Sequence, residues 1–257
     1  MWYSQGRAEV DVPGAADSYD PFAHVYDQHW GDFSQNSLEA LSVLLFPRLE
    51  PGARILDLCC GAGHLTGKLA ALGLDIVGLD GSRAMLGHAL HNAPGVPLIQ
   101  ADARLFGLRQ TFDAAVSTFD SLNHILASSD LDAVFQSVRA CLLSGGIFLF
   151  DLNTHEGYLE HWGGTTLIPG DVYTVSTWSS YDPSRRVGVF RAEIRKSGAI
   201  DDSVHTVELW QKHHPDRRVR TGLKSAGFQH IEVYGLEDGA LIQGHLDQAE
   251  RLFYLCR

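Results

Sequence analysis

Short apolar runs alternate with stretches of helical spacing from residue 51 to residue 155. Ile55–Leu58 is an apolar run typical of a buried strand, and His64–Leu72 follows it with leucines spaced like one face of a helix. Helical spacing is clearest before the fifth apolar run, at Leu131, Val134, Phe135, Val138 and Leu142. Because strands that alternate with helices form parallel sheets, this pattern predicts an α/β fold with a doubly wound sheet.

The pattern of apolar and polar residues changes after residue 155. Three stretches, 171–182, 186–195 and 203–212, alternate apolar and polar residues, which is typical of half-buried strands. Asp182-Pro183-Ser184 is a turn signal between the first two, so the three stretches favour antiparallel hairpins. The core pattern then returns, with a helix near Val219–Ala226 and strands at His230–Tyr234 and Leu252–Cys256.

These changes of pattern divide the chain into four predicted parts. Residues 1 to about 17 are polar and predict a mobile tail, and aromatic residues then precede a helical stripe that ends near Leu49. The predicted parts are an N-terminal tail and helical cap (1–50), a core (51–162), an inserted antiparallel lid (163–213) and the C-terminal part of the core (214–257).

Composition narrows the classes of protein. With 257 residues and 45% hydrophobic content, the chain can bury one full α/β core plus an insertion. Lys plus Arg number 20 against 31 acids, and a net charge of −11 disfavours nucleic acid. Four cysteines make no disulfide framework, and no signal peptide or membrane-spanning stretch is recognisable, so we expect a cytoplasmic protein. Despite 13 histidines no H-E-x-x-H occurs, so we expect no metal.

The sequence A-R-I-L-D-L-C-C-G-A-G-H-L-T around Asp57 combines a strand, a small-residue turn and the start of a helix. Gly61 and Gly63 allow a tight turn and a close approach of the backbone to a ligand. At the carboxyl edge of a parallel sheet, such a turn forms a nucleotide pocket. A dinucleotide fingerprint would need glycine where Thr66 lies. We also expect Asp57 to face the pocket, where a carboxylate repels a pyrophosphate and attracts a cation, so a nucleoside with a positively charged tail fits.

The same stretch resembles the first motif, D-x-G-x-G-x-G, of class I S-adenosylmethionine (SAM)-dependent methyltransferases, with Cys59 in place of the first glycine. Asp80 ends the second strand, about where an acid that bonds ribose hydroxyls is needed. Counting these two, five such segments lie in the family's order between Arg54 and Asp151. The resemblance implies a Rossmann-like, seven-stranded methyltransferase core, with SAM as cofactor and S-adenosylhomocysteine as product.

The resemblance also implies a set of cofactor contacts. In the family, the residue matching Asp102 contacts the adenine amino group, and the position of Met85 can lie near the adenine. Asp80 and Asp102 could instead cap the following helices, and Phe119 could stack on the ligand or pack in the core. The predicted cofactor-binding residues are Asp57, Cys59, Gly61, Ala62, Gly63, Asp80, Gly81, Met85, Asp102, Ala103 and Phe119.

An aromatic N-terminal helix, a SAM core, an inserted sheet and a closing strand resemble small-molecule methyltransferases, in particular the sugar N,N-dimethyltransferases of antibiotic biosynthesis and glycine N-methyltransferase. In the sugar enzymes a histidine beyond the fourth strand faces the transferred methyl, and His124 in S-T-F-D-S-L-N-H matches it. A tyrosine of the N-terminal helix lies over the methionine end, which makes Tyr19 and Tyr26 candidates. A histidine suits the removal of a proton from an amine, although His124 could instead cap a helix or orient a loop.

The sequence therefore predicts a SAM-dependent methyltransferase that acts on a small-molecule amine. An O-methyltransferase and a non-catalytic SAM-binding sensor or partner subunit are the alternatives, while an RNA methyltransferase fits the core but not the charge. We expect the inserted sheet to exclude water from the site, or its open edge to pair two copies into a homodimer. The predicted substrate-binding residues are Asp120, Asn123 and Trp30.

Overall fold

The structure, a computed structural model, describes residues 18–196, 204–237, 239–244 and 246–257, so the predicted tail lies outside the described residues. Within this part of the chain the larger sheet has eight strands. Five are parallel, and β12 is antiparallel to both β5 and β10. Their order is β11 (Ala240–Ile242), β10 (Ile231–Glu237), β12 (Arg251–Cys256), β5 (Leu142–Asn153), β4 (Phe112–Ser117), β1 (Arg54–Leu58), β2 (Asp75–Asp80) and β3 (Leu98–Gln100).

Helices cover both faces of this sheet, because successive residues of a strand point to opposite sides. Leu56 and Leu58 of β1 pack in one buried cluster with α6 (Ser128–Cys141) and α8 (Asp216–Ser225). Ile55 packs in the opposite cluster with α3 (Phe33–Leu44) and α4 (His64–Ala71). The remaining helices are η1 (Asp20–Phe22), α2 (Ala23–His29), η2 (Phe46–Arg48), α5 (Arg83–Asn92), η3 (Ser121–His124), α7 (His155–His161) and η4 (Leu246–Gln248).

The chain runs from β1 to β2 and β3 on one side and then crosses to β4 and β5 on the other. The switch in direction between β1 and β4 leaves a crevice at the carboxyl ends of these strands, where open α/β sheets bind ligands. The predicted doubly wound fold is thus confirmed, with β11 as an added edge strand. No helix in the described ranges is both long and apolar enough to cross a membrane.

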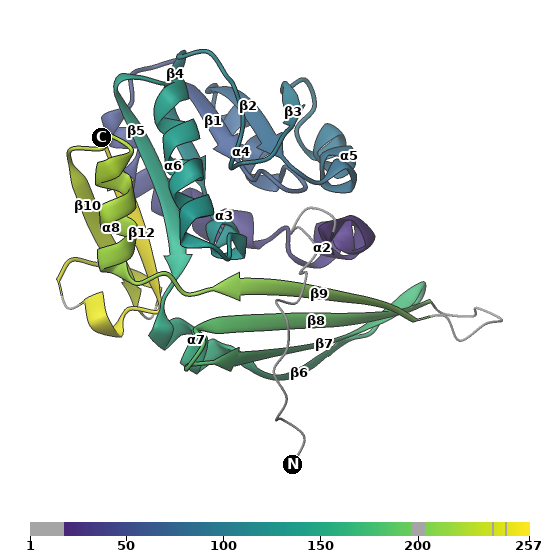
Figure 1. Cartoon of the computed structure of the whole chain (residues 1–257). Helices are drawn as coiled ribbons and strands as arrows, with labels where there is room; N and C mark the ends of the chain where they lie inside the picture. Colours follow the sequence, from purple (N-terminus) through teal and green to yellow (C-terminus); the bar gives the residue numbers. More distant parts are fainter. Residues whose placement is uncertain (1–17, 197–203, 238, 245) are drawn as a thin grey trace.

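The predicted inserted sheet is also confirmed. It is antiparallel, in the order β6 (Gly163–Ile168), β7 (Tyr173–Asp182), β8 (Val187–Lys196) and β9 (Val204–Lys212). Figure 1 shows its long strands below the carboxyl ends of β4 and β5, with α2 between the sheet and the core. Its inner face packs on the N-terminal segment, where Phe22 and Val25 meet Val175, Ala192, Val207 and Leu209. Most of the inserted sheet therefore packs against η1 and α2, and the carboxyl end of β9 contacts η3.

The four-part division of the chain stays a prediction. The helix α3 packs on one face of the larger sheet, in the same buried cluster as α4. The segments η1 and α2 contact the inserted sheet instead. The outer strand β6 leaves most of its residues exposed, and the predicted homodimer likewise stays a prediction.

Two helical glycines should respond oppositely to the same substitution. A Cβ on Gly67 of α4 would lie 2.2 Å from the backbone oxygen of Asn92, so Gly67→Ala should force α4 and α5 apart and cost roughly 1–3 kcal/mol of stability. At Gly87 of α5 no described atom lies within 4 Å of that position, so Gly87→Ala should stabilise by roughly 0.5–1 kcal/mol. Urea unfolding measures both, and equal stability of the two variants would contradict the close packing of these helices.

Candidate active site

The loop after β1 is held by its backbone conformation and by the end of β2. Cys59, Gly61 and Gly63 have φ values of 59°, 54° and 79°. A side chain on Gly63 would also meet the Ala89 Cα at 2.8 Å, so both conformation and space require glycine there. The Gly61 backbone N–H donates to Asp80 Oδ2 at 2.8 Å. Cys59 thus has the left-handed backbone conformation that glycine adopts more readily than residues with a side chain, and glycine is the residue of the family motif at this position.

A cavity of about 620 Å³ opens at the carboxyl ends of the parallel strands. Its volume lies within the range usual for small-molecule sites. Two of the lining residues that the sequence analysis did not suggest, Arg104 and Asp130, are used in the argument below. The predicted residues that line it are Tyr19, Tyr26, Cys59, Gly61, Asp80, Gly81, Met85, Asp102, Ala103, Phe119 and His124.

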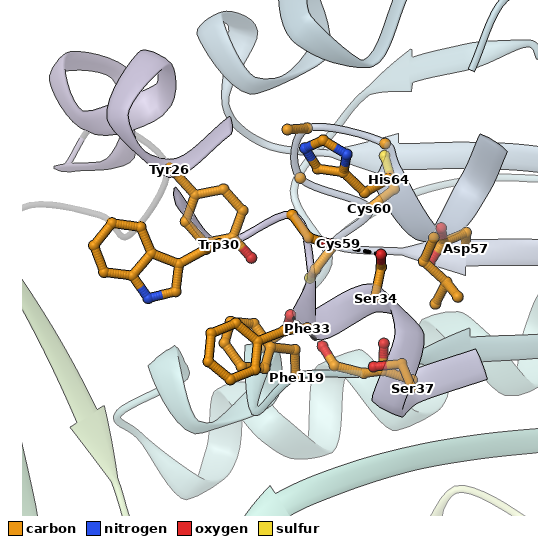
Figure 2. Close-up of a pocket in the computed structure, with 17 residues that line it drawn as sticks. Tyr26, Trp30, Phe33, Ser34, Ser37, Asp57, Cys59, Cys60, His64 and Phe119 are labelled. Atoms are coloured by element: carbon orange, nitrogen blue, oxygen red, sulfur yellow. Dashed lines mark hydrogen bonds between the residues drawn. The ribbon is translucent and has the colours of Figure 1, made fainter. Parts of the chain in front are cut away.

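A second, smaller cavity of about 60 Å³ adjoins the glycine loop and shares Tyr26, Cys59, Gly61 and Phe119 with the first. Figure 2 shows the rings of Phe33 and Phe119 overlapping on one side of it, with centroids 4.6 Å apart. The remaining predicted residues at this cavity are Ala62, Gly63, Asp57 and Trp30.

Asp57 lines this smaller cavity beside the glycine loop and does not line the larger one. The alternation along β1 points its side chain toward α3 and α4, where Thr66 Oγ1 donates to Asp57 Oδ2 at 2.6 Å. The side chain is buried, and burial raises the pKa of Asp57 to about 7.

Asp80 and Asp102 do not cap helices. Ser82 is the N-cap of α5 and accepts from the Met85 N–H at 3.1 Å, while Asp80 accepts from the backbone N–H of Gly61 and of Ser82. Burial raises the pKa of Asp80. Both carboxylates line the larger cavity. The alternative that Asp80 caps the following helix is therefore wrong, because the hydroxyl of Ser82 caps α5.

Asp102 forms an ion pair at the rim of the larger cavity. Arg104 Nη2 lies 2.6 Å from Asp102 Oδ2, and Arg104 Nη1 lies 3.0 Å from Asp130 Oδ2. The hydrogen bonds from Arg104 lower the pKa of Asp102. The sequence analysis missed Arg104, although its spacing two residues after Asp102 was a usable signal for a local pair.

His124 ends η3 and meets residues from two distant segments, the N-terminal segment and β9. Its Nε2 lies 3.1 Å from the Tyr19 hydroxyl and 3.2 Å from Gln211 Nε2, and its Nδ1 lies 2.9 Å from the Trp210 carbonyl oxygen. Burial lowers the pKa of His124, partly offset by the charge of Asp120. The neutral imidazole is thus favoured near pH 7.

Asp120 and Asn123 do not face the larger cavity, and their placement argues against the predicted substrate role. Among the described residues neither lines either cavity. The Asn123 side chain is fully buried, donating to the Lys212 carbonyl at 2.8 Å and accepting from the Asn153 N–H at 2.9 Å. Asp120 pairs with Arg251 at 2.8 Å. Both side chains instead fasten η3 to β5, β9 and β12.

Gln211 is a further residue that the sequence analysis missed. It is buried, and its amide nitrogen lies 2.5 Å from Asp120 Oδ2. No local signal identifies it, because it lies in a strand of alternating pattern and its partners are about 90 residues away.

Comparison with known proteins agrees with the fold and the loop. Residues 55–146 match the model of a family described as a methyltransferase domain. The dTDP-3-amino-3,4,6-trideoxy-alpha-D-glucopyranose N,N-dimethyltransferase of Streptomyces venezuelae is 31% identical over 159 residues, covering 60% of this chain and 67% of that protein. Uncharacterized methyltransferase sll0829 of Synechocystis is 32% identical over 152 residues, covering 57% and 66%.

Among solved structures, the sugar N-methyltransferase KedS8 from Streptoalloteichus superposes with a TM-score of 0.72 at 23% identity, covering 100% of this chain and 99% of that one. The fold, the glycine loop and these matches define a methyltransferase of class I. The chain belongs to the SAM-dependent methyltransferases: it is an enzyme whose cofactor is S-adenosylmethionine.

The raised pKa of Asp57 predicts a pH-dependent stability. Asp57 stays protonated in the folded protein up to about pH 7, but ionises near pH 4 when unfolded, so its contribution is present below pH 4 and is lost as the pH rises to 7. Relative to Asp57→Asn, the wild type should lose up to about 1.4 kcal/mol per pH unit across this window. Denaturant unfolding of both proteins at several pH values measures the difference; a difference independent of pH would show that Asp57 titrates normally.

Proposed function

We propose that this methyltransferase methylates the nitrogen of a small-molecule amine, and that Tyr19 and His124 face the acceptor. The observation that carries the proposal is the contact between the Tyr19 hydroxyl and His124 Nε2, 105 residues apart, in the wall of the larger cavity. A hydroxyl and a neutral imidazole at hydrogen-bond distance are the groups that can take a proton from an amine.

The residues present fit the cofactor. Asp80 would accept from the ribose hydroxyls, and Asp102 with Ala103 would meet the adenine, beside Met85. The smaller cavity would take the methionine end, where Asp57 offers a carboxylate to an ammonium group. Bound SAM supplies the methyl group in an electrophilic form.

The chain's own residues have two tasks in this reaction. Positioning the amine in line with the methyl can supply much of the acceleration. The amine must also be unprotonated so that its lone pair attacks carbon, and His124 would take the proton through Tyr19. The low pKa of His124 keeps the imidazole unprotonated and ready for this step at neutral pH.

The charge of the larger cavity favours an amine over an acidic acceptor. Asp80, Asp102 and Asp130 line it, and among the described residues Arg104 is the single Lys or Arg that does so. Arg104 is paired with both Asp102 and Asp130. The amino-sugar N,N-dimethyltransferase named above also acts on a nitrogen.

A panel assay decides the acceptor atom. We expect isotope-labelled methyl transfer from SAM to primary and secondary amines, and none to alcohols matched in size and shape. Transfer to the alcohols alone would identify an O-methyltransferase. Tight cofactor binding without transfer to any compound of a broad panel would favour a non-catalytic subunit.

Asp80→Ala should weaken cofactor binding. The wild type should bind S-adenosylhomocysteine with a Kd in the micromolar range, about −8 kcal/mol. Losing charge-assisted bonds to the ribose and the anchor of Gly61 should weaken this roughly 10- to 100-fold by calorimetry. Asp75→Ala, at the opposite end of β2, is the matched control and should keep wild-type affinity. Unchanged affinity in Asp80→Ala would remove Asp80 from the site.

His124→Asn should lower turnover roughly 10²–10⁴-fold while leaving cofactor affinity nearly unchanged. Since the base is the neutral imidazole, the wild-type rate should rise with pH and level off above the pKa of His124. Because burial lowers that pKa, the midpoint should lie below the ordinary histidine value of about 6.5. A pH profile of kcat measures this, and a His124→Asn variant with the wild-type rate would mean that positioning alone drives the reaction.

A further inference from the structure

We propose that Gln211 of the inserted sheet holds His124 in the tautomer that carries its proton on Nδ1, which leaves Nε2 to accept a proton through Tyr19. Gln211 is thus a positioning residue: it acts through His124. The proposal deepens the proposed function and rests on it for its catalytic consequence.

The orientation of the Gln211 amide is fixed by its neighbours. Its nitrogen lies 2.5 Å from Asp120 Oδ2, and an ionised carboxylate can only accept, so the amide must present its NH2 group there. Its oxygen accepts from the Tyr158 hydroxyl at 2.7 Å. The reverse orientation would set two acceptor oxygens 2.5 Å apart in a buried site. Asp120 is itself paired with Arg251, whose Nη2 lies 2.8 Å from Asp120 Oδ1.

Two independent contacts then fix the imidazole. The Gln211 amide nitrogen, which can only donate, lies 3.2 Å from His124 Nε2, so in this hydrogen bond Nε2 accepts and carries no proton. The Trp210 carbonyl, which can only accept, lies 2.9 Å from Nδ1, so the proton is there. Both contacts come from neighbouring residues of β9, and both require the same tautomer. The Tyr19 hydroxyl, 3.1 Å from Nε2, must therefore donate to it.

This arrangement defines a proton path from the acceptor nitrogen through the Tyr19 hydroxyl to His124 Nε2. As one N–H bond of the protonated (ammonium) acceptor breaks, the electron pair stays on nitrogen and the proton joins the Tyr19 oxygen, while the proton that Tyr19 already held moves to His124 Nε2. The Gln211 N–H opposes a proton on Nε2 and so keeps the resting histidine neutral. The titratable and charged groups around the imidazole are Tyr19 from the N-terminal segment, Asp120 before η3 and, behind Asp120, Arg251 of β12 and Asp151 of β5.

The tautomer is directly measurable in the wild-type enzyme. Long-range ¹H–¹⁵N NMR of the protein with S-adenosylhomocysteine should show His124 with Nδ1 protonated and Nε2 of the unprotonated type, the signals being assigned by their loss in His124→Asn. A proton on Nε2, or a mixture of tautomers, would overturn the proposal. This test uses no acceptor, so it can fail while amine methylation stands.

Gln211→Met keeps the length of the side chain but removes the donor. The rising limb of the pH–rate profile should move up by roughly one pH unit, because a hydrogen bond to the neutral form is lost, and the share of the Nδ1-protonated tautomer should fall. Thr177→Val, on the same face of the same sheet and buried, is the matched control and should change neither. An equal loss of rate at every pH, with an unmoved limb and an unchanged tautomer, would assign Gln211 a structural role and overturn the proposal.

Discussion

The geometry of the active site depends on one half-buried cation, Arg251, which lies between the carboxylates of Asp120 and Asp151. Asp151 also accepts from the Asp120 backbone N–H at 2.9 Å, so the pairing joins β12, β5 and the turn after β4. Removing one partner of such a pair typically costs about 3–5 kcal/mol, because the remaining charge stays buried. This anchoring allows Phe119 and Asp120 to keep φ values of 60° and 49°, which residues with side chains rarely adopt. The turn carries the chain into η3, where His124 lies.

Two further carboxylates fasten the N-terminal segment to the core from the other side of the site. Asp20 accepts from the Ser82 hydroxyl at 2.6 Å, and Asp27 lies 2.9 Å from His64 Nε2 and 3.0 Å from His88 Nδ1. These contacts tie η1 and α2 to α4 and α5, the helices that flank the glycine loop. The tyrosines of the segment are thereby fixed against the same cavity as His124, while the inserted sheet packs on the apolar side of the N-terminal segment. The site is therefore assembled from three separate parts of the chain.

The sequence predicted the features of the site that depend on residues close together in the chain. A strand, a small-residue turn and a helix bring the glycine loop and Asp80 together without help from the rest of the chain. Asp57 lines the smaller cavity and not the larger one, because the period of two along β1 turns its side chain toward α3 and α4. Asp120 and Asn123 adjoin His124 in sequence, but their partners lie 30 to 131 residues away, and the sequence carries no signal for such pairings. Gln211 was missed for the same reason.

The buried carboxyl groups around the site explain why it suits a cationic cofactor. Burial raises the pKa of Asp57, of Asp80 and of Asp151, which means that the folded chain resists ionising these carboxyls. Arg251 offsets this cost for Asp151, but Asp57 and Asp80 accept mainly from neutral hydroxyl and backbone N–H groups. A ligand with a sulfonium and an ammonium brings positive charge to a region that is short of it, and charged interactions are strong where water is excluded. Part of the free energy of cofactor binding would therefore come from relieving a cost already present in the free enzyme.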